Sequence, residues 1–267
     1  MNTQLLSDSR TAFTVQSAGY DANDVNNPIL PAWRRRVYTF TERWLKPGSN
    51  ILELNAGTGI DAIYLSTKGH RVHATDGAPG MIKEMKKKVN ARGLSQMMRV
   101  EQISFEQLPD VTGMYDLVFS NFGGLNCLSD LTVVTSQLGR LLKPGGLVIW
   151  VIMPPLCPWE WSWVFKGKFR AAFRRLNKEG TMAHIEGHRF RTYYHSVSEI
   201  KKALGQSFRL IGLEGLGSIS PPPFATRFTS DHEKFHKILT AVEERVCNIP
   251  PFNRWADHIM VSFQFKP

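Results

Sequence analysis

Short apolar runs alternate with segments of helical periodicity between residues 50 and 153 of this chain of 267 residues. The runs predict strands at residues 50–54, 70–75, 98–104, 115–120 and 147–153. Between them, apolar side chains recur every three or four positions, as they do on one face of a helix. The last run, LVIWVIM, is apolar throughout, which is typical of a strand buried on both faces. Strands that alternate with helices predict a doubly wound, Rossmann-like α/β sheet.

The residues on either side of this core carry weaker patterns. Trp33, Val37 and Phe40 lie at helical spacing, which predicts a helix over Ala32–Leu45. Residues 1–30 are polar and contain loop-like steps such as Asn26-Asn27-Pro28. We expect one domain, divided into a helical cap over 1–47, a core over 48–153, an insertion over 154–195 and further sheet elements over 196–267.

A glycine-bearing turn, Asn55-Ala56-Gly57-Thr58-Gly59, follows the first predicted strand. Gly57, Gly59 and Ala62 satisfy a relaxed dinucleotide fingerprint, which would suggest an oxidoreductase that uses NAD. In a dinucleotide site, however, the first glycine follows the strand closely. Here Glu53 closes the strand and the turn before Gly57 is one step longer, so the turn favours a different ligand.

Five segments in order resemble the motifs of the class I S-adenosylmethionine-dependent methyltransferases, over about residues 13–153. Asn55 stands where the family has its first glycine, and Ser104 where it often has an acidic residue. The resemblance implies a seven-stranded sheet that is parallel except for its last strand, with strands at 208–216 and 258–265 and helices at about 198–204 and 230–246. The five segments are 51–59, 73–76, 104–105, 115–121 and 142–147.

The resemblance also implies S-adenosylmethionine as the cofactor and assigns residues to its parts. The Asp76 carboxylate would accept hydrogen bonds from both ribose hydroxyls, and Glu53 would take the ammonium group. Glycines let the backbone approach the methionine part without a Cβ clash, and the helix N-terminus after the turn favours the ligand carboxylate. Ser104 and Phe105 would lie beside the adenine. The expected cofactor-binding residues are Tyr20, Arg34, Glu53, Asn55, Ala56, Gly57, Thr58, Gly59, Asp76, Gly77, Met81, Ser104, Phe105, Asn121 and Phe122.

The insertion after the fifth strand lies where the family builds its substrate pocket or lid. Between residues 159 and 178, aromatic side chains interleave with basic ones. As one helix, Trp161, Phe165, Phe169 and Phe173 would form a stripe. Three interpretations are open: a lid helix that packs this stripe on the domain, which we favour, a basic amphipathic helix that contacts a membrane or a lipid-like substrate, and a nucleic-acid platform without a recognised RNA-binding motif.

Charge and cysteine content narrow these interpretations only a little. The net charge is +10, which alone suggests an anionic partner, but residues 1–150 carry 16 basic and 13 acidic side chains, and residues 151–267 carry 17 and 10. The surplus therefore lies mostly outside the cofactor motifs and indicates no clear nucleic-acid partner. Three widely spaced cysteines, no secretory signal and no run near the roughly 20 apolar residues of a membrane span predict a cytoplasmic protein.

Methyl transfer depends mainly on proximity and orientation, and a base is needed only if the nucleophile keeps its proton. The candidates for that base are His184, His188, Tyr193, Tyr194 and His195, with His184, Tyr193 and His195 preferred. No third ligand accompanies His184 and His188 to make a metal site. The sequence therefore predicts a methyltransferase that acts on a small, apolar or lipid-like acceptor. An RNA methyltransferase and a non-catalytic cofactor-binding module stay as alternatives, and the acceptor, the methylated atom and the oligomeric state stay open.

Overall fold

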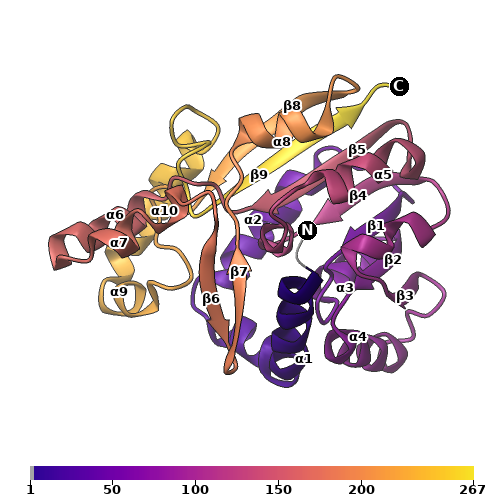
Figure 1. The fold of residues 1–267 in the computed structure, drawn as a ribbon, viewed down its shortest axis with the longest axis horizontal. Helices are drawn as coiled ribbons and strands as arrows, with labels where there is room; N and C mark the ends of the chain where they lie inside the picture. Colours follow the sequence, from indigo (N-terminus) through magenta and orange to yellow (C-terminus); the bar gives the residue numbers. More distant parts are fainter. Residues whose placement is uncertain (1–2) are drawn as a thin grey trace.

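A seven-stranded sheet runs through the middle of the molecule in the computed structural model, which describes residues 3–267, with side chains described from residue 7 (Figure 1). The strand order is β3-β2-β1-β4-β5-β9-β8, and only β9 runs antiparallel to its neighbours. This confirms the predicted sheet. The strands are β1 (Asn50–Leu54), β2 (Arg71–Asp76), β3 (Met98–Gln102), β4 (Tyr115–Ser120), β5 (Leu142–Ile152), β8 (Phe208–Leu216) and β9 (His258–Phe265).

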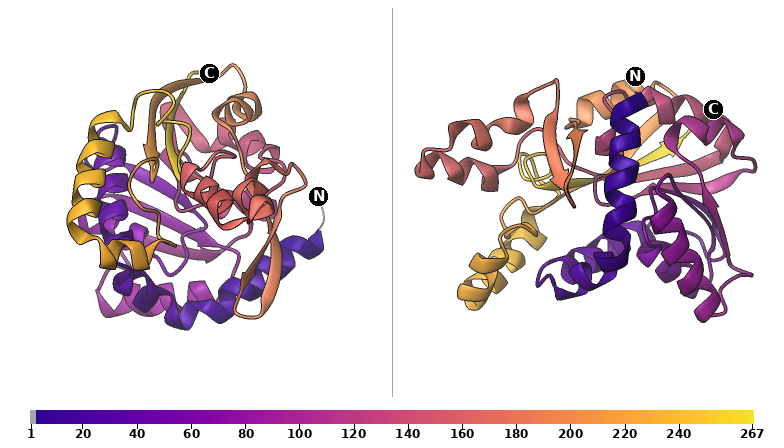
Figure 2. Two further views of the ribbon diagram at one scale, coloured as in Figure 1. Left: turned by 90° about the vertical axis from the view of Figure 1, so that its left-hand side faces the viewer. Right: turned by 60° about the horizontal axis from the view of Figure 1, so that its bottom comes forward.

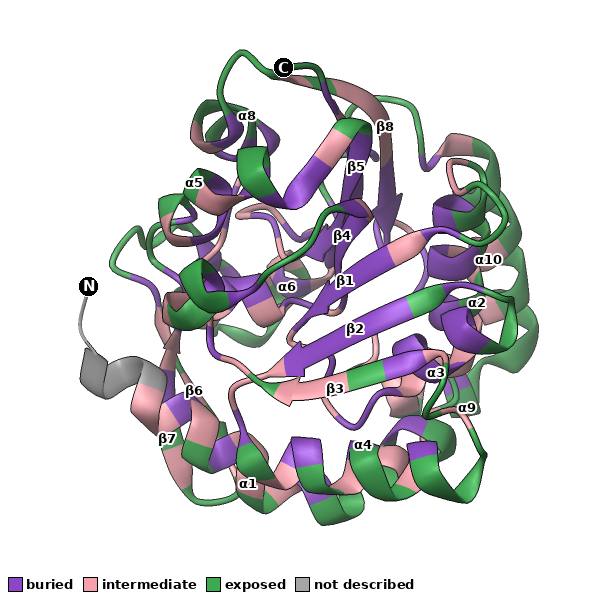
Figure 3. Cartoon of the chain, turned by 90° about the vertical axis from the view of Figure 1, so that its right-hand side faces the viewer, coloured by how far each residue is buried: buried purple, intermediate pink, exposed green. Residues whose placement is uncertain are grey.

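Helices cover both faces of the sheet, because neighbouring residues of each strand point to opposite sides (Figure 3). Leu52 packs with α5 (Thr132–Leu141) and α8 (Val197–Leu204). Ile51 packs with α2, α3 and α4 on the other face. These helices span Leu30–Glu42, Ile60–Thr67 and Pro79–Ala91 respectively, and the 3-10 turns η1 and η2 span Phe105–Asp110 and Gly124–Cys127.

The N-terminal segment forms a long helix, α1 (Thr3–Asn26), so the loop-like interpretation of residues 1–30 is wrong. The helix gave no clear pattern because its buried positions include the small or polar residues Ser9, Ala12 and Ser17. It lies across the edge of the sheet at which the parallel strands end, as Figure 2 shows. Close packing needs a glycine after β2, since a Cβ on Gly80 would come within 2.5 Å of the α1 backbone.

The insertion is not one helix, which corrects the predicted aromatic stripe. It consists of short turns and a hairpin, and Gly167, at φ +67°, separates two of the turns. Phe165 is 93% exposed, and Phe169 and Phe173 are exposed too, so these rings do not pack on the domain. The elements are α6 (Pro158–Trp161), η3 (Ser162–Lys166), α7 (Phe169–Ala172), η4 (Arg174–Leu176), β6 (Thr181–Ile185) and β7 (His188–Thr192).

The helix expected at about 230–246 is present as α10 (Glu233–Val246), and a short helix that was not predicted, α9 (Thr226–Asp231), precedes it. They project from the sheet on the same side as α6 and α7 (Figure 1). The hairpin β6–β7 instead packs on α1, where the Phe13 and Phe190 rings lie 5.5 Å apart. Among residues 3–267, every helix is either too short or too polar to cross a bilayer.

Candidate functional site

A pocket with about 870 Å³ of empty space, counted together with the open solvent at its mouth, lies at the carboxyl ends of β1, β2 and β4. Parallel sheets bind their ligands at this edge, and α1 covers part of it. Among the predicted cofactor-binding residues, those that line the pocket are Tyr20, Asn55, Gly57, Asp76, Gly77, Met81, Ser104, Phe105, Asn121 and Phe122. The others, Arg34, Glu53, Ala56, Thr58 and Gly59, lie outside its lining.

Asp76 ends β2 and presents its carboxylate to the pocket. Its two oxygens accept hydrogen bonds from the backbone N–H groups of Gly57, at 2.9 Å, and Ala78, at 2.8 Å. Burial raises the pKa of this carboxyl, and the two backbone donors oppose the shift. Each oxygen keeps a further lone pair, so the carboxylate can still accept hydrogen bonds from a bound diol.

The loops after β1 and β4 are joined through Asn55. Its backbone is left-handed, with φ +46°, a conformation that asparagine tolerates and that explains how it replaces the family's glycine. Its side chain accepts a hydrogen bond from Ser120 Oγ at 2.7 Å and donates one to the Asn121 carbonyl at 3.1 Å. A Cβ on Gly124 would lie 2.2 Å from the Asn55 side chain, so the next turn must be glycine-bearing as well.

Arg34 supports the pocket from behind and does not line it, contrary to the predicted contact with the cofactor. Its guanidinium group is buried and pairs with Asp24 at 2.8 Å and with Asp61 at 2.6 Å. Asp61 also accepts a hydrogen bond from Asn121 Nδ2 at 2.9 Å. The Nε, Nη1 and Nη2 atoms of Arg34 all donate hydrogen bonds to the carboxylates of Asp24 and Asp61. Arg34 therefore positions Asn121 through Asp61, and its guanidinium group packs over the Phe122 ring, 4.8 Å from the ring centre.

Glu53 is buried just behind the turn, and its Oε2 has no hydrogen-bond partner. Burial, with Asp61 adding to it, raises the pKa of this carboxyl well above its usual range. A ligand ammonium group nearby would stabilise the ionised form of Glu53. Thr58 and Gly59 lie below the surface of the pocket, and the first turn of α3 carries Asp61, which disfavours the phosphates of a dinucleotide at this helix end.

The opposite wall of the pocket is apolar, with Ile103, Phe105 and Leu108 after β3 and Met81 on α4. Such a wall suits a planar nucleobase such as adenine. The Ser104 hydroxyl donates a hydrogen bond to Gln107 Oε1 at 3.0 Å as part of a capping box. Ser104 therefore starts η1 and does not replace the missing acid as a free donor or acceptor.

The predicted base candidates do not reach this pocket. His184 is exposed on β6, and Tyr193 is half-buried after β7. His195 is buried, with its pKa lowered by burial, and its Nε2 bonds to the Leu128 carbonyl at 2.8 Å. Neither these three residues nor the other two candidates, His188 and Tyr194, are among the residues that line the pocket.

Sequence reasoning missed two residues at the same edge of the sheet, Asp257 and His258. Because β9 is antiparallel, it begins where the parallel strands end, and His258 is its first residue. The signal was present: the strand 258–265 was predicted as antiparallel, and that topology puts its first residue at the ligand edge.

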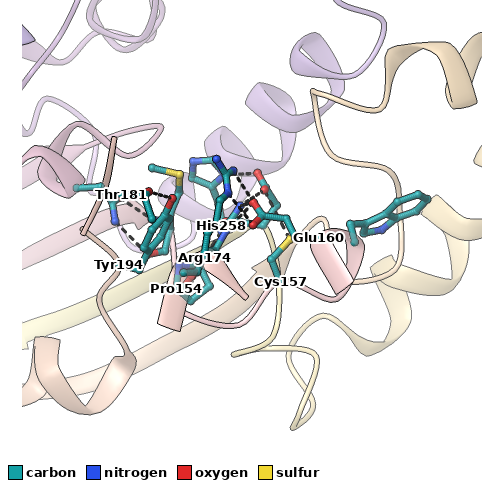
Figure 4. Close-up of polar contacts among 12 residues, drawn as sticks. Pro154, Cys157, Glu160, Arg174, Thr181, Tyr194 and His258 are labelled. Atoms are coloured by element: carbon teal, nitrogen blue, oxygen red, sulfur yellow. Dashed lines mark hydrogen bonds and ion pairs between the residues drawn. The ribbon is translucent and has the colours of Figure 1, made fainter. Parts of the chain in front are cut away.

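A buried ion-pair cluster fastens the insertion to this point (Figure 4). Glu160 is fully buried and accepts hydrogen bonds from Arg174 and Arg175. Arg175 also binds Asp257, with 2.5 Å between Nη2 and Oδ1. Cys157, Glu160 and Asp257 lie within 4.8 Å of one another, but arginines already pair with both carboxylates.

The pocket thus offers the groups that S-adenosylmethionine requires. A buried carboxylate at the end of β2 suits the ribose diol, a glycine turn suits the methionine part, an unpartnered acid lies behind that turn, and an apolar wall suits the adenine. Asp76, Gly57, Glu53 and Phe105 would hold these parts in turn. When bound, this cofactor supplies a methyl group on a sulfonium, which is already activated toward nucleophiles.

Comparison with known proteins agrees with this geometry. Residues 51–146 match the model of a methyltransferase domain family. A demethylmenaquinone methyltransferase from Thermus thermophilus is 34% identical over 125 residues, which are 46% of this chain and 54% of that protein. A sarcosine/dimethylglycine N-methyltransferase from Halorhodospira halochloris is 32% identical over 127 residues, 46% and 45% of the two chains. The chain therefore spans about half the length of these curated relatives.

Solved structures share the fold over most of the chain. An S-adenosylmethionine-dependent methyltransferase from Clostridium acetobutylicum has a TM-score of 0.58 at 13% identity, covering 88% of this chain and 91% of that one. A geranyl diphosphate C-methyltransferase from Streptomyces coelicolor has a TM-score of 0.56 at 13% identity, covering 87% and 76%. Residues 51–146 therefore match a methyltransferase domain, and the chain shares the fold of solved S-adenosylmethionine-dependent methyltransferases.

Proposed function

We propose that this protein transfers the methyl group of S-adenosylmethionine to a small, apolar or lipid-like acceptor. The observation that carries the proposal is the Asp76 carboxylate at the end of β2, facing a pocket with a glycine turn on one side and an apolar wall on the other. The enzyme would act mainly by holding the two reactants in line and excluding water. No side chain is needed to activate the methyl group itself.

The exposed part of the insertion supports an apolar acceptor. Phe165 and Phe169 are exposed on η3 and α7, and exposed basic residues are their neighbours in the sequence. Exposed aromatic rings that gather into a patch are typical of a surface that meets a partner. Relatives named for demethylmenaquinone point to the same class, since that quinone is a membrane lipid. The exposed cations are Lys166, Lys168, Arg170 and Lys178.

The acceptor class can be tested by incubating the purified protein with methyl-labelled S-adenosylmethionine and a panel of acceptors. The panel should contain reduced demethylmenaquinone, sarcosine and transfer RNA. Label transfer to the quinol would support the proposal. Transfer to RNA alone, or release of no S-adenosylhomocysteine with any acceptor, would contradict it.

The insertion is expected to bind anionic membranes. Replacing Phe165 and Phe169 by alanine should weaken binding to phosphatidylglycerol vesicles about tenfold or more, because burial of one phenylalanine contributes about 1.5–3 kcal/mol. Vesicle co-sedimentation measures this. Met114→Ala, an exposed apolar residue before β4, is the matched control and should bind as the wild type does. Equal binding of the double variant and the wild type would exclude this surface as the contact.

Cofactor binding should depend on the ionisation of Asp76. Ribose hydroxyls donate to the carboxylate, so its protonation removes the acceptor that they need. Because burial raises the pKa of Asp76, the affinity for S-adenosylhomocysteine should fall on acidification at a higher pH than for an ordinary aspartate. Calorimetric titrations between pH 8 and pH 4.5 measure this. Asp76→Asn should bind S-adenosylhomocysteine more weakly at every pH, and its affinity should not show this fall on acidification.

A further inference from the structure

His258 lies against the wall of the cofactor pocket. Its ring meets the ring of Phe122 edge-on, with centroids 6.0 Å apart, and the ring of Trp33 at 5.8 Å. A Cβ built on Gly123 would lie 3.4 Å from His258 Nε2. Phe122 and Gly123 both line the pocket, so the imidazole lies directly behind two of its lining residues.

Asp257 fixes the orientation of this ring. Its Oδ2 lies 2.9 Å from His258 Nδ1. Burial alone would raise the pKa of Asp257, but Arg175 and His258 hold it well below its usual range. The ionised carboxylate can only accept, so Nδ1 donates to it, and in the neutral imidazole Nε2 is then the nitrogen with the lone pair.

Nε2 of His258 makes no hydrogen bond with any of the described residues. The side chain is 11% exposed, and Nε2 is not among the fully enclosed atoms that lack a partner. In the view of Figure 4, His258 stands between Tyr194 on one side and Glu160 with Cys157 on the other. An oriented, unpaired basic nitrogen thus lies where the insertion meets the cofactor pocket.

We propose that His258 is the catalytic base of the methyl transfer, that Asp257 is its positioning residue, and that the acceptor is a phenol or enol whose hydroxyl donates to Nε2. This inference rests on the proposed function and narrows its acceptor. A protonated hydroxyl is a weak nucleophile, so methylation at this oxygen, or at a ring carbon conjugated with it, gains from removal of the proton.

The proton balance is simple. The O–H bond of the acceptor breaks, its electron pair stays on the acceptor, and the proton passes to Nε2. The acceptor then forms a bond to the methyl carbon while the carbon–sulfur bond breaks with its electron pair left on sulfur. The imidazolium is stabilised by the Asp257 carboxylate and later releases its proton to water, as general acid–base pairs of this kind do.

Other histidines near the insertion lack this arrangement. The Nε2 of His195 is engaged by a backbone carbonyl, and His184 lies exposed on the hairpin. Asp257 is a poor target for a test, because it also holds Arg175 and its loss would disturb the fold. His258→Gln removes the base and leaves that ion pair intact.

The test uses 4-nitrophenol as the probe, because its phenolate absorbs visible light and its phenol does not. With saturating S-adenosylhomocysteine, at a pH where the free probe is mostly protonated, the wild type should bring out the phenolate band. His258→Gln should reduce the band at least tenfold. It should also slow methyl transfer to a phenolic acceptor about 100-fold, with little change in KM. His232→Gln, an exposed histidine between α9 and α10, should match the wild type.

Calorimetry with S-adenosylhomocysteine separates the two proposals and reports on folding. Intact cofactor binding with no phenolate band in the wild type, or an undiminished band in His258→Gln, would overturn the assignment of the base and leave the proposed function standing. A wild-type chain that does not bind S-adenosylhomocysteine would overturn the proposed function and the base with it. If His258→Gln binds the cofactor poorly, His258→Asn is measured in its place against the same two outcomes.

Discussion

Asp76→Ala should weaken the binding of S-adenosylhomocysteine by about 100-fold or more. Hydrogen bonds to a charged group contribute about 1.5–3 kcal/mol each, and a tenfold change in affinity corresponds to about 1.4 kcal/mol. The expected loss of two ribose contacts therefore accounts for at least two orders of magnitude. The carboxylate also orders the turn at Gly57 and the start of α4 at Ala78, which adds to the loss.

Isothermal titration calorimetry measures this effect, and Asp110→Ala is the matched control. Asp110 is an exposed acid at the end of η1, so its removal makes the same chemical change outside the pocket. The control should bind as the wild type does. An Asp76→Ala protein that stays folded and keeps its affinity within about threefold would remove Asp76 from the cofactor site.

Arg175→Met should lower the free energy of unfolding by about 3–5 kcal/mol. The variant removes the cation that the buried carboxylates of Glu160 and Asp257 share, and breaking a buried ion pair by removing one partner costs about that much, even though Arg174 and His258 still contact one carboxylate each. The pair works only while the acids are ionised. Because the pKa of Asp257 is depressed in the folded state, its contribution is complete above the usual aspartate range and is lost as the pH falls below it.

Urea denaturation at neutral pH measures this change, with Lys168→Met as the control. Lys168 is exposed on the same insertion, so its replacement should change stability by less than about 0.5 kcal/mol. A loss below about 1 kcal/mol for Arg175→Met would mean that the cluster does not fasten the insertion to the start of β9.

The sheet could be predicted from the sequence because its strands are short apolar runs between turn residues. β1 and β4 have the bounds that the pattern predicted, and β8 and β9 have those that the family resemblance implied. The helix α1 could not, since it buries small and polar side chains against a glycine-bearing loop and carries no apolar stripe. The prediction of one helix in the insertion was wrong for another reason. The aromatic residues recur every four positions, but this spacing does not reveal that Gly167 divides the segment.

The cofactor pocket followed from motif order, and most of its predicted residues do line it. Arg34 does not line the pocket. The sequence alone could not reveal this, because the ion pairs of Arg34 with Asp24 and Asp61 form only in the folded chain. The base candidates lie in the insertion, and none of them lines the pocket: His184 is exposed on the hairpin, and His195 is engaged by the Leu128 carbonyl. His258 is distant in sequence from every cofactor motif, and only the antiparallel register of β9 brings it there.

Native mass spectrometry of the purified chain with added ligand tests the central claim most directly, because it reads the cofactor and its stoichiometry in one spectrum. The account predicts one S-adenosylhomocysteine per chain, and an unchanged mass when NAD is added under the same conditions. A chain that takes up NAD, or that shows no S-adenosylhomocysteine adduct, would contradict it.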